Sequence, residues 1–98
     1  MVLIAFDVDG TLDCSQGPVS VERLRYLSTE GIRIVIVSPS RNRPQGFEES
    51  IQGNRFENLK AIPNQEGLLF KLYISDNHGD DEVAKAAGFS FCHPWDFR

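Results

Sequence analysis

The sequence predicts a small three-layer α/β domain with a mostly parallel sheet. Three observations support this prediction: apolar runs suited to buried strands, segments of helical periodicity between them, and a length of 98 residues, which suits one domain. Apolar residues make up 41% of the chain and charged residues 24%, a composition that supplies a core without the charge excess of disordered chains. We therefore expect residues 1–98 to form one domain.

The first half of the chain predicts a right-handed βαβ unit. Residues 2–6 are apolar on both faces, as in a central strand that is covered by helices on each side. Apolar positions recur at helical spacing over residues 21–30, where Ser20 can cap the start and Gly31 can end the helix. Residues 32–37 form a β-branched run, so two buried strands flank one helix.

The second half continues the alternation of strand and helix. Residues 44–52 suit a short helix, and residues 59–62 suit a short third strand. Residues 68–74 are expected to form a fourth strand, residues 80–87 a helix and residues 89–92 a last strand. In such sheets, ligands bind beyond the carboxyl ends of the strands.

Composition limits the classes of partner. Ten Lys and Arg against fourteen Asp and Glu give a net charge of −4, so the chain lacks the basic surface of a general nucleic-acid binder and must bind any phosphate locally. Cys14 and Cys92 have no metal-binding spacing and are interpreted as reduced thiols. The longest apolar run, residues 2–6, is far too short to span a membrane. We expect a cytoplasmic protein without membrane contact.

Acidic residues follow two of the predicted parallel strands. Asp7 and Asp9 point the same way as the chain leaves the first strand, and Asp76 and Asp80 follow the fourth. Parallel strands bring these acids to one edge of the sheet. Crowded carboxylates repel one another unless they bind protons or a cation, and an all-oxygen site suits Mg²⁺. Turn formation and helix capping are the alternative roles for these acids.

Residues 4–12 read Ile-Ala-Phe-Asp-Val-Asp-Gly-Thr-Leu, which resembles the first motif of the haloacid dehalogenase (HAD) superfamily. Ser38, at the end of the second predicted strand, is similar to the second motif. Asp76 and Asp80 have the four-residue spacing of the fourth motif, although Ser75 stands where the family usually has glycine. The resemblance implies a Rossmann-like (HAD-like) fold. Neither place where the family inserts a cap domain has enough residues for one, so it implies a capless member with an open site.

The third motif of the family is a lysine, and two lysines are candidates. Lys60 follows the predicted third strand and would lie at the carboxyl edge of the sheet. Lys71 lies inside the fourth strand, where its side chain would point along a sheet face. We therefore prefer Lys60 as the phosphate-binding lysine.

The resemblance implies a Mg²⁺-dependent phosphatase, a phosphomonoester hydrolase that works through an aspartyl-phosphate. Asp7 would be the nucleophile, and Asp9 would act as general acid and then as general base. Asp80 would orient a metal-bound water or the lysine. The site residues implied are Asp7 and Asp9 for catalysis; Asp7, Asp9, Asp76 and Asp80 for the metal; and Ser38, Lys60, Gly10 and Thr11 for the substrate.

Two other functions remain open at this stage. One is a phosphate- or metal-binding module of the same fold that has lost turnover, and the other is a receiver-like phosphoacceptor. The substrate could be a small-molecule or a macromolecular phosphate ester, and Arg41 and Arg43 either select an anionic substrate or form a solvated turn. An open site needs closure, so we expect a large substrate or a neighbouring subunit of a homo-oligomer to provide it.

Overall fold

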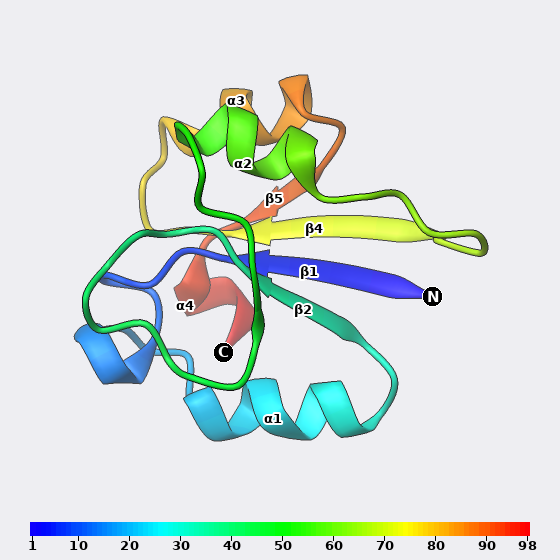
Figure 1. Cartoon of the computed structure of the whole chain (residues 1–98). Coiled ribbons are helices and arrows are strands. Elements are labelled where there is room, and N and C mark those ends of the chain that lie inside the picture. Colours follow the sequence, from blue (N-terminus) through cyan, green and yellow to red (C-terminus); the bar gives the residue numbers. More distant parts are fainter.

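The chain forms one parallel five-stranded sheet that helices cover on both faces (Figure 1). This description comes from a computed structural model that covers residues 1–98. The predicted three-layer α/β fold is confirmed, with strand order β3-β2-β1-β4-β5. The elements are β1 (Val2–Phe6), η1 (Asp13–Ser15), α1 (Val21–Thr29), β2 (Arg33–Ile36), β3 (Glu48–Glu49), α2 (Arg55–Ala61), β4 (Phe70–Ile74), α3 (Asp80–Ala86), β5 (Ser90–Cys92) and α4 (Pro94–Phe97).

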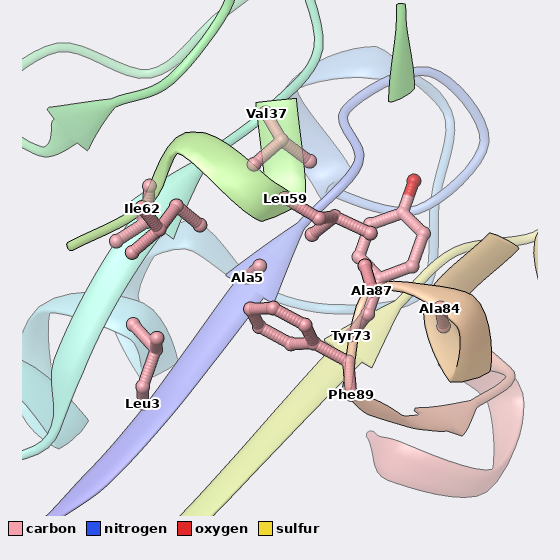
Figure 2. Packing of buried hydrophobic residues seen from close by; sticks show 10 residues of the cluster. Leu3, Ala5, Val37, Leu59, Ile62, Tyr73, Ala84, Ala87 and Phe89 are labelled. Carbon is pink, nitrogen blue, oxygen red and sulfur yellow. The ribbon is translucent and has the colours of Figure 1, made fainter. Parts of the chain in front are cut away.

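The sheet separates two hydrophobic clusters, which explains why β1 is apolar on both faces. Alternate residues of a strand point to opposite faces, so Leu3 and Ala5 join the cluster under α2 and α3, shown in Figure 2. Ile4 and Phe6 join the cluster on the side of α1 and α4. Both clusters consist of buried side chains, so the central strand is covered on each side as its sequence predicts.

Side-chain caps start helices α1 and α2. Ser20 caps α1 by accepting hydrogen bonds from the backbone N–H groups of Glu22 and Arg23 at 3.1 and 3.4 Å. Asn54 and Glu57 form a reciprocal capping box at the start of α2. This capping box fixes the position of Arg55, the first residue of the helix.

Two of the expected elements are wrong. Residues 44–52 do not form a helix but include β3, which pairs with β2; Arg33 binds both carboxylate oxygens of Glu48, at 2.9 and 2.6 Å, and favours the extended pairing. Residues 59–62 are not a strand, because the capping box starts a helix that runs through Ala61. Leu59 and Ile62 still pack against the sheet, at the i,i+3 spacing of a helix face.

The register of the sheet aligns the loops that follow three strands. Phe6 pairs with Ile36 of β2 and with Ile74 of β4. The residues that come next, Asp7 after β1 and Ser75 after β4, therefore leave the sheet at the same level. No helix has both the length and the apolar character needed to cross a membrane.

We expect Leu24→Ala in α1 to lower the free energy of unfolding by about 2–5 kcal/mol, because it leaves a cavity in the cluster on the α1 side. Leu24 has an exposed fraction of 0%. Leu69→Ala is the matched control, since Leu69 is 84% exposed and its truncation removes little packing. Urea unfolding of both variants measures the difference, and equal losses would contradict this account of the core.

Candidate functional site

A buried carboxylate lies at the centre of the carboxyl edge. Asp7 follows β1 and is only 7% exposed. Its Oδ1 accepts a hydrogen bond from Arg55 at 3.2 Å, and its Oδ2 lies 3.4 Å from the hydroxyl of Ser75. Burial raises the pKa of Asp7, Arg55 opposes that rise, and the negative charges of Asp76 and Asp80 add to it. The site therefore holds a carboxylate whose charge is disfavoured by its surroundings.

Arg55 is the cation that faces this carboxylate. Its Nη1 donates to the backbone carbonyl of Val37 at 2.6 Å, and its Nε lies 3.9 Å from Oδ2 of Asp80. One guanidinium therefore connects the loop after β2, the Asp7 carboxylate and the start of α3. A cation in the first turn of a helix is opposed by the helix dipole, so the position of Arg55 requires these acidic partners.

Asp80, the first residue of α3, is buried and shares Ser75 and Arg55 as neighbours with Asp7. Its Oδ2 accepts hydrogen bonds from the hydroxyls of Tyr73 at 3.0 Å and Ser75 at 2.9 Å. Burial is the largest cause of the raised pKa of Tyr73, which keeps this phenol protonated as a donor. Ser75, the residue that departs from the family pattern, thus links the Asp80 and Asp7 carboxylates. In this arrangement Asp80 positions its neighbours.

Asp76 approaches the loop after β1 through two residues of the first motif. Its backbone N–H donates to the hydroxyl of Thr11 at 3.2 Å. Gly10 has a φ of +74°, and a Cβ at this residue would overlap the Asp76 carboxylate. Gly10 and Thr11, which the sequence suggests as substrate-binding residues, therefore bring the acids of β1 and β4 together.

Asp9 lies at the exposed rim of the site and is held by two hydroxyls. Its Oδ1 accepts hydrogen bonds from Ser15 at 2.5 Å and from Ser40 at 2.7 Å. These two bonds lower the pKa of Asp9, with Ser15 contributing most. Asn42 donates to the Ser15 hydroxyl at 3.2 Å, so the loop after β2 closes onto the loop after β1.

Ser38 lies beside this group, whereas the two candidate lysines do not. Ser38 is buried directly after Val37, and its Oγ accepts from the Ser40 N–H at 3.3 Å. Lys60 is exposed in the last turn of α2, about 140° around the helix axis from Arg55. Lys71 pairs with Leu3 at the other end of the sheet, and its Nζ lies 4.9 Å from the Phe89 ring centre.

The placement of Lys60 at the carboxyl edge is therefore corrected. It depended on a third strand over residues 59–62, and these residues are helical up to Ala61. Arg55 supplies the positive charge beside Asp7. The sequence does not single out Arg55, because the family pattern calls for a lysine and Arg55 is an arginine at the start of a helix. The available signal was the Asn54–Glu57 capping box, which marks a helix start just after β3.

The oxygen ligands available for a metal are few. No three His, Cys, Asp or Glu side chains form a group that could hold a metal ion. Asp76 offers a carboxylate beside Gly10, its charge also acts on the Asp7 carboxylate, and the loop after β1 carries the Asp9 carbonyl. Mg²⁺ commonly binds one or two carboxylates and keeps several waters, so this oxygen set suits it.

The acids lie on an open edge and not in an enclosed pocket. The larger surface hollow, about 440 Å³, lies at the amino edge of the sheet and is lined in part by Gln65, Lys71 and Ser90. A second hollow, about 250 Å³, lies beside α2 next to Gly53 and Ala61. Neither hollow is lined by Asp7, Asp9, Asp76 or Asp80. A substrate of these acids would therefore bind on the open surface of the loops.

Comparisons with protein-family models, with curated proteins and with solved structures gave no match.

We expect Asp7→Asn to raise the melting temperature of the metal-free protein at pH 7. The ordinary pKa of this carboxyl is 3.8 and burial raises it in the folded state, so between these two values the folded protein holds more protons than the unfolded chain. Stability therefore falls as the pH rises through this window, and the ionised Asp7 destabilises the fold above it.

Thermal melts in EDTA test this expectation. The advantage of Asp7→Asn should disappear at acid pH, where Asp7 is protonated in both states. A lower melting temperature for the variant at pH 7 would show that the ion pair with Arg55 outweighs the cost of burial.

Proposed function

We propose that the protein is a Mg²⁺-dependent phosphatase that hydrolyses phosphomonoesters through an aspartyl-phosphate on Asp7. The observation that supports this most is the buried Asp7 carboxylate at the end of the central strand, with Arg55 at 3.2 Å and a second carboxylate, Asp76, packed beside Gly10 of the loop that follows. The resemblance of residues 4–12 to the first HAD motif supports the same chemistry.

The cationic and hydroxyl groups around Asp7 suit a phosphoryl group. Arg55 presents a planar guanidinium that can bind two phosphoryl oxygens, and Ser38 places a hydroxyl on the β2 side of Asp7. Because Arg55 also pairs with Asp7, it holds the attacking carboxylate next to the phosphoryl group that it binds. These contacts supply positioning and charge stabilisation, the main requirements of phosphoryl transfer.

Two steps complete the reaction. In the first, an Asp7 carboxylate oxygen bonds to phosphorus, the bond from phosphorus to the ester oxygen breaks, and Asp9 donates a proton to the leaving oxygen. In the second, Asp9 takes a proton from water, whose oxygen bonds to phosphorus as the Asp7–phosphorus bond breaks and releases phosphate. A bound phosphate dianion raises the pKa of Asp9 and so supports its protonation for the first step.

The proposed metal would be held by oxygen atoms of this edge. Asp7 and Asp76 would hold Mg²⁺ with the Asp9 carbonyl, and Asp80 would act through Ser75 and Arg55 instead of binding the ion directly. When bound, Mg²⁺ neutralises part of the negative charge of the acids and the phosphoryl oxygens.

A non-catalytic phosphate- or metal-binding module is the second candidate. The hydroxyls of Ser15 and Ser40 favour the ionised form of Asp9, whereas a general acid must be protonated. Such a module would bind phosphate at Arg55 and Ser38 without turnover. Turnover therefore separates the two candidates.

Hydrolysis of p-nitrophenyl phosphate with Mg²⁺ is the decisive experiment. We expect turnover that EDTA abolishes, and Asp7→Asn to retain less than about 1% of it, because the amide keeps the size of the side chain but cannot act as the nucleophile. Acid quenching of the wild-type reaction should trap phosphate on Asp7. Phosphate binding without turnover would favour the non-catalytic module, and full activity of Asp7→Asn would exclude the covalent role.

Arg55→Ala and Lys60→Ala form a matched pair of cation deletions on α2. We expect Arg55→Ala to lower kcat/KM by about 10²- to 10³-fold, as expected when a donor to the reacting oxygens is removed. Lys60→Ala should change it by less than about twofold, since Lys60 is exposed on another side of the helix. Circular dichroism confirms that both variants fold. The opposite ranking would restore Lys60 to the site.

A further inference from the structure

Two features of the open edge are not used by the proposed chemistry, and they lie on opposite sides of Asp7. In the strand order β3-β2-β1-β4-β5, the loop after β2 lies on one side of β1, and the loops after β4 and β5 lie on the other. The first loop carries Arg41. The other two carry His78 and His93.

Arg41 is an exposed cation without a partner. It has no hydrogen bond or ion pair through its side chain, whereas its neighbour Arg43 binds Glu49 at 3.0 Å and the carbonyls of Pro39 and Ser40 at 3.1 and 3.0 Å. Arg43 therefore holds the loop in place, and Arg41 remains free to bind an anion. The Ser40 hydroxyl binds Asp9, so the residue next to Arg41 touches the rim of the site.

His78 and His93 form a stacked pair on the other side. Their ring centres are 4.9 Å apart and their planes differ by 17°. His78 is exposed, and its ring stacks on His93 without making a hydrogen bond. Neighbouring strands are about 4.8 Å apart, so loops on β4 and β5 lie one and two strand spacings, roughly 5–10 Å, from the loop that carries Asp7.

We propose that the substrate is the phosphorylated end of a single-stranded nucleic acid. This inference rests on the proposed phosphatase function and names its substrate class. The terminal phosphate would lie at Asp7, the base of the terminal nucleotide would stack on the exposed ring of His78, and the next phosphate along the strand would bind Arg41. Hydrolysis consumes one water, releases inorganic phosphate and leaves a hydroxyl end.

The open site suits this substrate, and the net charge limits the contact to the end of the strand. A strand end needs an uncovered edge along which the rest of the strand can leave, and the acids lie outside both surface hollows. The net charge of −4 argues against binding along a long strand, so recognition is confined to the terminal nucleotides. A phosphopeptide supplies no second phosphate for Arg41, which makes it the less suitable macromolecule.

Steady-state kinetics on a graded set of substrates tests the proposal. The set comprises short oligothymidylates phosphorylated at the 3′ or the 5′ end, thymidine monophosphate, deoxyribose 5-phosphate, which lacks the base, and a phosphotyrosine peptide. We expect one of the oligonucleotides to have the highest kcat/KM and deoxyribose 5-phosphate to be poorer than the mononucleotide. The highest value on the peptide or on deoxyribose 5-phosphate would overturn the proposal.

Variants of the two features give independent readouts. His78→Ala should lower kcat/KM on the oligonucleotide by about five- to a hundredfold and leave deoxyribose 5-phosphate unchanged, while His78→Phe keeps a stacking face and should retain most of the rate. Arg41→Ala should reduce the slope of the logarithm of the oligonucleotide binding constant against the logarithm of the salt concentration by about one. Lys85→Ala, at the far end of α3, should leave that slope unchanged. Equal losses on all substrates would contradict a role in recognition.

Binding measurements separate this inference from the proposed function. Fluorescence anisotropy with Asp7→Asn should show tighter binding of the phosphorylated oligothymidylate than of the same strand with a hydroxyl end, and His78→Ala should weaken it. Turnover on small phosphates without any preference for the strand end supports the phosphatase and overturns the substrate class. Selective binding without turnover on any substrate supports the substrate class and overturns the phosphatase.

Discussion

The Asp7 carboxylate is held in surroundings that oppose its charge, and the rest of the carboxyl edge is arranged around it. Burial raises its pKa, and the neighbouring acids Asp76 and Asp80 act in the same direction. Arg55 is the nearest compensating charge, and it is placed there by the capping box that starts α2. A helix start some 50 residues along the chain therefore decides whether the acid after β1 can remain ionised in the folded domain.

The strand order brings further polar side chains next to Asp7 and Arg55. Because β1 lies between β2 and β4, the loops after those two strands meet on either side of Asp7. Side-chain hydrogen bonds then join the loops: Ser40 to Asp9 from the β2 side, and the Asp76 N–H to Thr11 from the β4 side. The parallel sheet brings the three loops to one edge, and these hydrogen bonds determine which of their side chains face one another.

The sequence allowed the fold class and the central acids to be predicted, because both depend on patterns that are local in the chain. Continuous apolar runs identify buried strands, and acids at their ends must share one edge of a parallel sheet. Such local patterns do not indicate the strand β3 or the cation Arg55. β3 has only two residues, Glu48 and Glu49, and owes its pairing to Arg33, 15 residues away. Arg55 meets Asp7 across 48 residues, a contact that no local pattern indicates.

The hydrogen bonds that shape the rim also order the loops that carry it. Asp9 joins the loops after β1 and β2 through Ser15 and Ser40, and Arg55 ties the loop after β2 to α2 through the Val37 carbonyl. These loops are ordered by polar contacts among themselves and with α2. The hydroxyls that order the rim also lower the pKa of Asp9. The same two serines therefore set both the order of the loops and the protonated fraction of Asp9. Bonds that order the loops reduce that protonated fraction until a negatively charged ligand raises the pKa of Asp9 again.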